Sequence, residues 1–321
     1  MDLATMAHRR ILVIRLGALG NIVQSLGPFA AIRAHHPDAE ITLLTLKPYA
    51  NWMRSAPWFD RVWIDEQPAW WDLPGLLRLR RRLIAGQFDR VYDLQTSRRS
   101  NRYFKFFPRN NRPEWSGIAP GCSHPDADSN RNRLHDLVRQ PNQLRQAGIA
   151  HTPPADLSWC TGDIARFDLP RHGRIVLLVP GCSPTRPGKR WPVQHYAALA
   201  AEFVRRGVTP VVIGTESERD LGRAIHDAVP ETVDLTGRTS LGDVADLGRA
   251  AVGAVGNDTG PMHLIAATGC RCVAIFSHDS DPALCAPGGA DVRVLRRQYL
   301  ATLTPAEVLA AFDAGASVPG N

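Results

Sequence analysis

The feature that most constrains the fold of this chain is a regular alternation of short apolar runs with segments of helical spacing. In the N-terminal half, apolar runs of strand length occupy residues 11–14, 41–45, 61–64 and 90–94. Apolar residues with helical spacing occupy residues 22–33 and 73–84. Because strands that alternate with helices usually pair in parallel, this pattern predicts an α/β fold with a mostly parallel sheet.

The same alternation resumes in the C-terminal half after a break. The periodicity fades across residues 148–172, and strands are then expected at residues 174–179, 210–213, 232–235, 253–255 and 272–276. Helices are expected between them, at residues 192–206, 217–228, 241–250 and 261–268. Since 321 residues exceed what one core usually supports, we predict two Rossmann-like domains, residues 1–160 and 161–321, with parallel sheets facing across a cleft. Packing of the final helix back on the first domain is compatible with this prediction.

Composition and cysteine spacing exclude several classes of protein. The chain is 44% hydrophobic and 21% charged, which is typical of a folded protein. The apolar run at residues 11–14 is too short for a signal-peptide core, and no run reaches the ~20 apolar residues of a membrane span, so we expect a cytoplasmic protein. The six cysteines show neither a CxxC pair nor a histidine at zinc-ligand spacing, so we expect no disulfide and no structural metal.

The positive charge of the chain is concentrated in its N-terminal half. The net charge is +7, and basic residues cluster at Arg78 and 80–82 and again at 98–112. Such a surface fits nucleic acid, anionic lipid or phosphorylated glycan, and a solvated helix face is an equally open interpretation. Nucleic acid is the weakest of these partners, because the basic residues are not interleaved with a nucleic-acid-binding motif.

Ligands of doubly wound sheets bind at the carboxyl ends of the strands, so the loops there are informative. The first loop, residues 15–21, contains a Gly-x-x-Gly turn that fits either a close approach to an anion or a plain tight turn. The second, residues 180–192, offers Ser183, Thr185 and Lys189 as a phosphate clamp, with an ordinary polar loop as the alternative.

Two further loops precede helices of the second half. In residues 213–218, Glu216 and Glu218 fit hydrogen bonds to ribose hydroxyls, or equally the stabilisation of a helix N-terminus. The most specific loop, residues 256–263, reads Gly-Asn-Asp-Thr-Gly-Pro-Met-His. Its backbone amides and the Thr259 hydroxyl converge before a helix that starts with Pro261, whereas a structural cap would need only one such residue.

Together these motifs resemble glycosyltransferase family 9, the ADP-heptose:lipopolysaccharide heptosyltransferases, over nearly the whole chain. The resemblance rests on RLGALGNIV at residues 15–23, DLQ at 93–95, PGCS at 180–183, KRWP at 189–192, DLTG at 234–237, Ser240-Leu241, the loop 256–263 and Asp281-Pro282. It implies a GT-B fold and inverting transfer without a metal or other cofactor. It also implies an ADP-sugar donor, an anionic glycolipid acceptor and peripheral contact with the inner face of the cytoplasmic membrane.

The resemblance also assigns roles to residues. It implies donor-binding roles for Ser183, Thr185, Lys189, Glu216, Glu218, Asp258, Thr259, Gly260 and His263, with Lys189 also stabilising the leaving diphosphate. Of the two glutamates, Glu218 resembles the ribose-binding acid, and Glu216 is a close second. Acceptor-binding roles are expected for Gly20, Gln95, Arg98, Arg99 and Arg102. Two DxD patterns, at residues 126–128 and 279–281, match a metal-binding motif of other glycosyltransferases, but we do not expect them to bind metal.

The chain departs from the family at the residue that should deprotonate the acceptor. The family has an aspartate as catalytic base where this chain has Asn21, and a neutral amide cannot accept a proton near pH 7. Three accounts remain open: another residue acts as base, the protein is a nucleotide-sugar-binding homologue with weak or no transferase activity, or the chain is a substituted variant.

Overall fold

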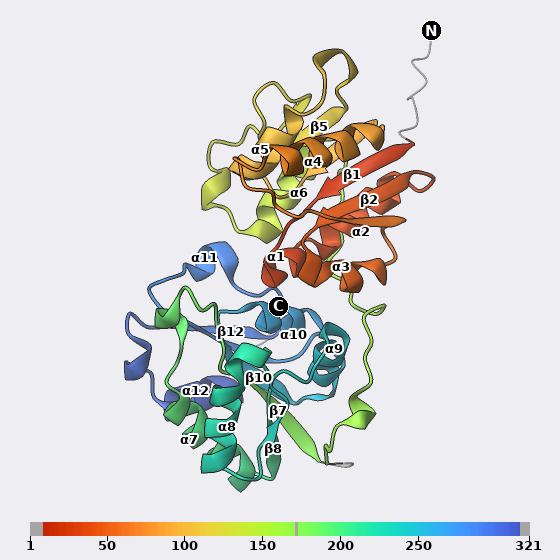
Figure 1. The fold of residues 1–321 in the computed structure, drawn as a ribbon. Coiled ribbons are helices and arrows are strands. Elements are labelled where there is room, and N and C mark those ends of the chain that lie inside the picture. The colour runs from red at the N-terminus through yellow and green to blue at the C-terminus, as the bar shows by residue number, and fades with distance from the viewer. Residues whose placement is uncertain (1–8, 171–172, 315–321) are drawn as a thin grey trace. The chain divides into compact units, whose positions relative to one another are not determined.

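The computed structural model describes residues 9–170 and 173–314, which belong to two compact units (Figure 1). One unit extends through Ala155, and the other begins at Asp156. Each unit contains a six-stranded parallel sheet with its own hydrophobic core. Among the described residues, no helix is both long and apolar enough to cross a membrane.

The sheet of the first unit has the strand order β3-β2-β1-β4-β5-β6. Its strands are β1 (Arg10–Ile14), β2 (Glu40–Thr45), β3 (Arg61–Ile64), β4 (Arg90–Asp93), β5 (Glu114–Gly117) and β6 (His124–Pro125). The order reverses between β1 and β4, where Ile14 pairs with Asp93. In doubly wound sheets, ligands bind at the carboxyl ends of the strands at such a reversal, so the loops after β1 and β4 are candidate binding loops.

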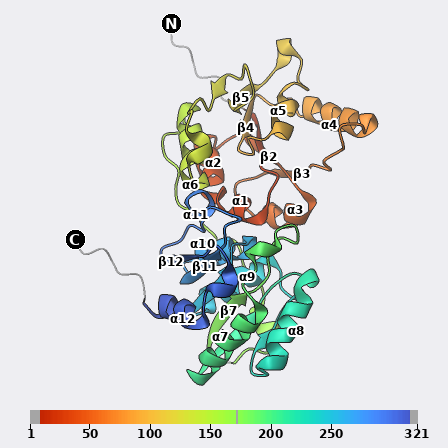
Figure 2. The same ribbon diagram turned by 90° about the vertical axis from the view of Figure 1, so that its left-hand side faces the viewer.

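Helices cover both faces of this sheet. They are α1 (Leu19–Val23), α2 (Leu26–His35), α3 (Lys47–Arg54), α4 (Leu73–Ala85), α5 (Arg98–Phe104) and α6 (Asp136–Gln146). Figure 2 shows α2 and α6 on one side of the strands and α4 and α5 on the other. The strands β1, β2 and β4 are buried almost throughout, which explains why they read as largely apolar runs rather than alternating ones.

The helix expected over residues 22–33 is in fact two helices, α1 and α2. The carbonyl of Asn21 accepts hydrogen bonds from the Arg15 guanidinium and from Ser25 Oγ at 2.8 Å. The Ser25 amide therefore bonds to the carbonyl of Ile22 at 2.9 Å instead of continuing the α-helical pattern. The break places the short α1 immediately after the first loop.

The sheet of the second unit has the order β12-β11-β10-β7-β8-β9, which is the same topology. Its strands are β7 (Arg174–Val179), β8 (Val208–Val212), β9 (Val233–Asp234), β10 (Gly253–Asn257), β11 (Cys272–Phe276) and β12 (Val292–Arg296). Here the order reverses between β7 and β10, where Val179 pairs with Gly256. The two most informative loops of the sequence, residues 180–192 and the one after β10, thus begin at neighbouring strand ends.

The helices of this unit are α7 (Val193–Arg205), α8 (Arg219–Ala228), α9 (Leu241–Ala250), α10 (Gly260–Ala267), α11 (Pro282–Cys285) and α12 (Pro305–Asp313). The expected helix 217–228 begins with a 3₁₀ turn at Glu216–Glu218 before α8. Helix α12 packs against α7, β11 and β12, with the rings of Phe312 and Phe203 5.0 Å apart. Val308 and Phe312 of this final helix thereby complete the core of the second unit.

Candidate functional site

A buried ion pair joins the two loops at the strand reversal of the second unit. Lys189 ends the 3₁₀ turn Pro187–Lys189, and its Nζ donates to Oδ2 of Asp258 at 2.5 Å. Both residues are less than a tenth exposed. Among the residues that the structure describes, Asp258 is the hydrogen-bond partner of Nζ, so two of its three N–H donors remain for a ligand.

Asn257, which the sequence analysis did not select as a site residue, fixes the geometry of this pair. Its Oδ1 accepts from the Trp191 amide at 3.0 Å and the Tyr196 hydroxyl at 3.1 Å. Its Nδ2 donates to the carbonyl of Pro180 at 2.7 Å. The fully buried side chain thereby ties both ends of the loop 180–192 to β10. In the sequence, the only sign of this role is that Asn257 is an amide residue at the end of an apolar strand.

The start of helix α10 follows the ion pair directly. Thr259 is the N-cap residue, but its hydroxyl makes no capping hydrogen bond, and the carboxylate of Asp258 is held by Lys189. The purely structural cap weighed for this loop is therefore not formed. Gly260 begins the helix, and His263 lies buried one turn later. The first amides of α10 are the hydrogen-bond donors that favour an anion at a helix N-terminus.

The two hydroxyl residues of the loop 180–192 lie on its exposed part. Ser183 and Thr185 contact each other, with 2.9 Å between Oγ and Oγ1. They precede Lys189 in the same loop, so the structure places two hydroxyl groups and one ammonium group on a single segment. These groups can donate hydrogen bonds to phosphate oxygens.

The structure separates the two glutamates that the sequence left as alternatives. Glu216 is exposed, and its Oε1 lies 2.6 Å from Arg219 Nε. Glu218 closes a capping box in which its Oε2 accepts from the Thr215 amide at 2.7 Å. A Cβ atom added to Gly181 would lie only 1.9 Å from Oε1 of Glu218, so this carboxylate lies against the end of β7. Glu218 is therefore the acid that reaches the strand reversal.

The DxD carboxylates take part in contacts of their own chain. Asp126 Oδ2 accepts from Arg131 Nε at 2.7 Å, and Asp281 caps α11 by accepting from the Ala283 amide at 3.1 Å. Within the described ranges, no group of three or more histidine, cysteine, aspartate or glutamate residues could hold a metal ion. The six cysteines are free thiols.

The strand reversal of the first unit also holds a buried ion pair. Arg15 follows β1, and its Nη2 donates to Oδ2 of Asp136, the first residue of α6, at 2.9 Å. Its Nη1 donates to the Leu94 carbonyl at 2.7 Å, and Nε and Nη2 both donate to the Asn21 carbonyl. Burial lowers the pKa of Arg15, and the negative charge of Asp136 partly offsets this effect. Asp136 was missed because it lies 121 residues away and belongs to no motif.

Asn21 lies half-buried in α1, with its side chain turned toward its own loop. Its Nδ2 donates to the Gly17 carbonyl at 3.1 Å. Gly20 precedes it and is buried, and Gln95 accepts from the Leu16 amide at 2.9 Å. The structure thus brings Gln95 against the loop that carries Gly20 and Asn21.

Asp93 ends β4 beside this loop and is fully buried. Burial raises its pKa from 3.8 to about 6, although the amides of Thr96 and Gln95 donate to its Oδ1 and partly offset the effect. The carboxyl group therefore titrates in a range where ordinary aspartates are fully ionised. The carboxyl group also hydrogen-bonds to the Ser100 side chain of α5, so it fixes the backbone at Gln95 and Thr96 against that helix.

The three arginines expected to bind the acceptor are all on α5. Arg98 and Arg102 are exposed, whereas Arg99 is half-buried. The guanidinium of Arg102 lies 3.9 Å and that of Arg99 4.8 Å from the centre of the Trp70 ring. Two of the three are thus stacked on one aromatic side chain, which holds their charges together.

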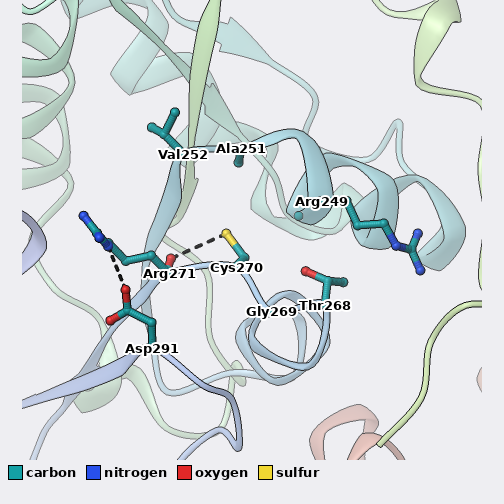
Figure 3. A pocket seen from close by; sticks show the side chains of 9 residues that line it. Arg249, Ala251, Val252, Thr268, Gly269, Cys270, Arg271 and Asp291 are labelled. Atoms are coloured by element: carbon teal, nitrogen blue, oxygen red, sulfur yellow. Dashed lines mark hydrogen bonds and ion pairs between the residues drawn. The ribbon is translucent and has the colours of Figure 1, made fainter. Parts of the chain in front are cut away.

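A separate pocket of about 350 Å³ lies in the second unit (Figure 3). Its wall includes Val252 and Arg271, which directly precede β10 and β11. In Figure 3 the Arg271 side chain is paired with Asp291, at 2.8 Å between Nε and Oδ2. The pocket lies at the amino ends of the strands, opposite the edge at which doubly wound sheets bind ligands.

Comparisons with known proteins agree on one family. The family described as glycosyltransferase family 9 (heptosyltransferase) matches residues 76–304. Lipooligosaccharide heptosyltransferase 2 of Haemophilus ducreyi is 25% identical over 287 residues, which cover 80% of each chain. The Haemophilus influenzae protein of the same name is 34% identical over 111 residues, and this match spans only 32% of its length.

Solved structures resemble both units. ADP-heptose lipopolysaccharide heptosyltransferase II of Escherichia coli has a TM-score of 0.76 at 23% identity, covering 95% of this chain and 98% of that one. The Escherichia coli heptosyltransferase WaaC with ADP has a TM-score of 0.75 at 20% identity, covering 94% and 98%. This likeness confirms the expected fold class, an α/β protein of GT-B type with two Rossmann-like parallel sheets.

Proposed function

Because the chain belongs to glycosyltransferase family 9, we propose that it transfers a heptose-type sugar from an ADP-sugar donor to a lipopolysaccharide-core or related glycan acceptor. The observation that carries the proposal is the buried pair of Lys189 and Asp258 beside the open N-terminus of α10. A buried cation with unused donors, next to a row of helix amides, is suited to an anionic group such as a diphosphate.

In the proposed donor site, the diphosphate lies against Lys189, Thr259, Gly260 and the hydroxyls of Ser183 and Thr185. Asp258 holds the ammonium group of Lys189 in place, and His263 lines the same end of α10. When the bond between the anomeric carbon and the diphosphate oxygen breaks, negative charge grows on the leaving ADP. Lys189 and the amides of α10 stabilise that charge, which lowers the barrier. The reaction requires no metal ion, because this positive charge is supplied by the protein.

The nucleoside end of the donor is assigned to Glu218. Its carboxylate lies against Gly181 at the end of β7, whereas the Glu216 side chain is exposed and paired with Arg219. We therefore prefer Glu218 over Glu216 as the acid that accepts hydrogen bonds from the ribose hydroxyls. The acceptor is assigned to Gly20, Gln95, Arg98, Arg99 and Arg102 of the first unit, where clustered guanidinium groups suit anionic substituents of a glycolipid. The reaction is proposed to occur at the inner face of the cytoplasmic membrane.

Inverting transfer needs a base, because the acceptor hydroxyl loses its proton as its oxygen attacks the anomeric carbon. At the family position, Asn21 offers a neutral amide whose Nδ2 is bonded to the Gly17 carbonyl. This observation favours a second candidate function, a nucleotide-sugar-binding homologue with weak or no transferase activity. General-base catalysis is worth ~10²–10⁴-fold, so the two candidates differ by a measurable rate.

The test incubates the purified chain with ADP-heptose and deacylated lipopolysaccharide core, and follows the product by mass spectrometry. The Asn21→Asp variant is compared with the native chain and with Asn21→Ala, while calorimetry measures ADP binding by each. Transfer that rises roughly 10²-fold or more in Asn21→Asp alone supports a transferase that lacks its base. Equal transfer by all three chains means that another group deprotonates the acceptor. ADP binding without transfer by any chain overturns the transferase function and leaves the binding function.

A further inference from the structure

Large apolar side chains are exposed where helix α4 begins. Trp71 is 85% exposed, Leu73 64% and Leu77 48%. A monomeric protein exposes single apolar residues routinely, but a contiguous group marks an interaction site. Here three lie within seven residues.

The exposed leucines form one face of the helix. Leu73 and Leu77 are one turn apart and therefore lie on the same side of α4, whereas Gly75, Leu79 and Leu83 are buried on the other side. Exposed basic residues border this side toward the C-terminus of the helix, at Arg78, Arg80 and Arg81, whereas the Arg82 guanidinium stacks on the Trp63 ring at 4.5 Å. An apolar stripe bordered by arginines is typical of helices that lie in the interface of a membrane.

Helix α5 adds charge beside this stripe. The Arg99 side chain donates to the Pro68 carbonyl at 3.2 Å, and Arg80 Nε donates to the Phe106 carbonyl at 3.1 Å. The helices α4 and α5 lie side by side in both views (Figures 1 and 2). Trp70, which is stacked under Arg99 and Arg102, joins the start of α4 to α5.

The charge balance of this segment is one-sided. Residues 70–112 contain eleven basic and three acidic side chains, a net charge of +8, whereas the whole chain carries +7. Of the three acids, Asp93 is buried and Asp72 caps α4 by accepting from the Gly75 amide at 2.9 Å. The entire positive excess of the protein therefore lies in and around these two helices.

We propose that Trp71, Leu73 and Leu77, with Arg78, Arg81 and Arg102, form a surface that binds anionic phospholipid bilayers; we call it the α4 surface. The apolar side chains enter the boundary between headgroups and acyl chains, and the arginines contact the lipid phosphates. The inference rests on and deepens the proposed function, because a glycolipid acceptor lies in such a bilayer. Nucleic acid fits less well, since its phosphates leave an exposed leucine stripe without a partner.

The test is flotation of the full-length chain with vesicles, without donor or acceptor. The native chain should float with vesicles containing 30% phosphatidylglycerol and not with pure phosphatidylcholine. Trp71→Ser/Leu73→Ser/Leu77→Ser should lower the bound fraction by about tenfold or more. Arg78→Gln/Arg81→Gln should lower it and flatten its dependence on salt. All replaced side chains are exposed, so circular dichroism should show native unfolding curves.

Matched controls come from the second unit. Tyr299→Ser removes an aromatic side chain that is 63% exposed, and Arg205→Gln/Arg223→Gln removes two exposed arginines. Both controls should bind vesicles like the native chain. Equal binding by the serine variant and the native chain overturns the proposal, as does tighter binding to duplex DNA than to anionic vesicles. Vesicle binding without any sugar transfer would support lipid binding by the α4 surface and would contradict the proposed function.

A second measurement locates the insertion. Tryptophan fluorescence of the native chain should be quenched by vesicles whose lipids carry brominated acyl chains. Trp71→Phe keeps an apolar ring, so it should bind vesicles as before but lose most of the quenching. Unchanged quenching in this variant would overturn the insertion of Trp71.

Discussion

The two sheets share one strand order, but the strand reversals hold their buried cations differently. In the first unit, the Arg15 guanidinium donates to the Leu94 and Asn21 carbonyls and to Asp136, so four of its five N–H donors are occupied by its own chain. In the second unit, Lys189 is bonded to Asp258 and keeps donors for a ligand. Position at a strand reversal therefore does not by itself make a side chain a ligand-binding group. What matters is which donors remain after the fold is satisfied.

The largest expected effect tests whether Arg15 is structural. Arg15→Met leaves Asp136 buried with only Arg139 beside it, and breaking a buried pair costs roughly 3–5 kcal/mol of unfolding free energy. Urea unfolding followed by circular dichroism measures the loss. Arg139→Gln, which removes the more exposed partner of Asp136, should cost less than half as much. A stable Arg15→Met chain that cannot transfer sugar would contradict the structural role.

The next effect tests the cation of the second unit. Lys189→Gln retains a hydrogen bond to Asp258 but removes the charge, and loss of one such stabilising group lowers catalysis by about 10²–10³-fold. The measurement is kcat/KM for sugar transfer, with ADP affinity by calorimetry alongside. The exposed Arg205→Gln serves as control and should change neither. ADP affinity that is the same in Lys189→Gln and in the native chain would remove Lys189 from the donor site.

A pH-dependent effect tests the burial of Asp93. Since burial holds the folded pKa at about 6, the unfolded chain loses this proton first as pH rises, and unfolding free energy falls between about pH 4 and 6. Asp93→Asn lacks this fall, so its stability relative to the native chain should increase by up to about 3 kcal/mol across the window. Urea unfolding at several pH values measures the difference. The exposed Asp220→Asn should show no such change. If the difference in unfolding free energy between Asp93→Asn and the native chain does not change with pH, the pKa of Asp93 is an ordinary one.

The smallest effect sharpens the choice between two glutamates. Glu218→Gln should weaken ADP binding by about tenfold, because hydrogen bonds to a charged acceptor are worth more than neutral ones. Glu216→Gln should leave the affinity within twofold, since its side chain is exposed and paired with Arg219. Calorimetry with ADP compares the two. The reverse order of effects would move the ribose-binding role to Glu216.

The sequence predicted those parts of the fold that are governed by local apolar pattern. The strands β1, β7 and β11 are buried on both faces, so their apolar runs are unambiguous. The two-residue strand β6, His124–Pro125, has no such run and was not predicted. The break between α1 and α2 was also missed, because apolar spacing continues across it. The break depends on the Asn21 carbonyl, whose partners include Arg15 of a preceding loop.

Within the site, the sequence found residues whose type suits a ligand and missed those that position them. Lys189 and Asp258 were both selected, but their 2.5 Å contact joins residues 69 apart. Asp136 and Asn257 act through contacts with distant backbone and side-chain groups, which spacing along one chain does not reveal. The resemblance already favoured Glu218 over Glu216, and the position of Gly181 supports that order.

The single amide of Asn257 has a consequence for the thermodynamics of donor binding. It bonds to the Pro180 carbonyl at one end of the loop and to the Trp191 amide at the other. These two buried hydrogen bonds fix both ends of the loop. The loop therefore loses backbone entropy when the chain folds rather than when a nucleotide binds. The segment that carries Lys189 is preorganised, so ordering it does not subtract from the affinity for the ligand.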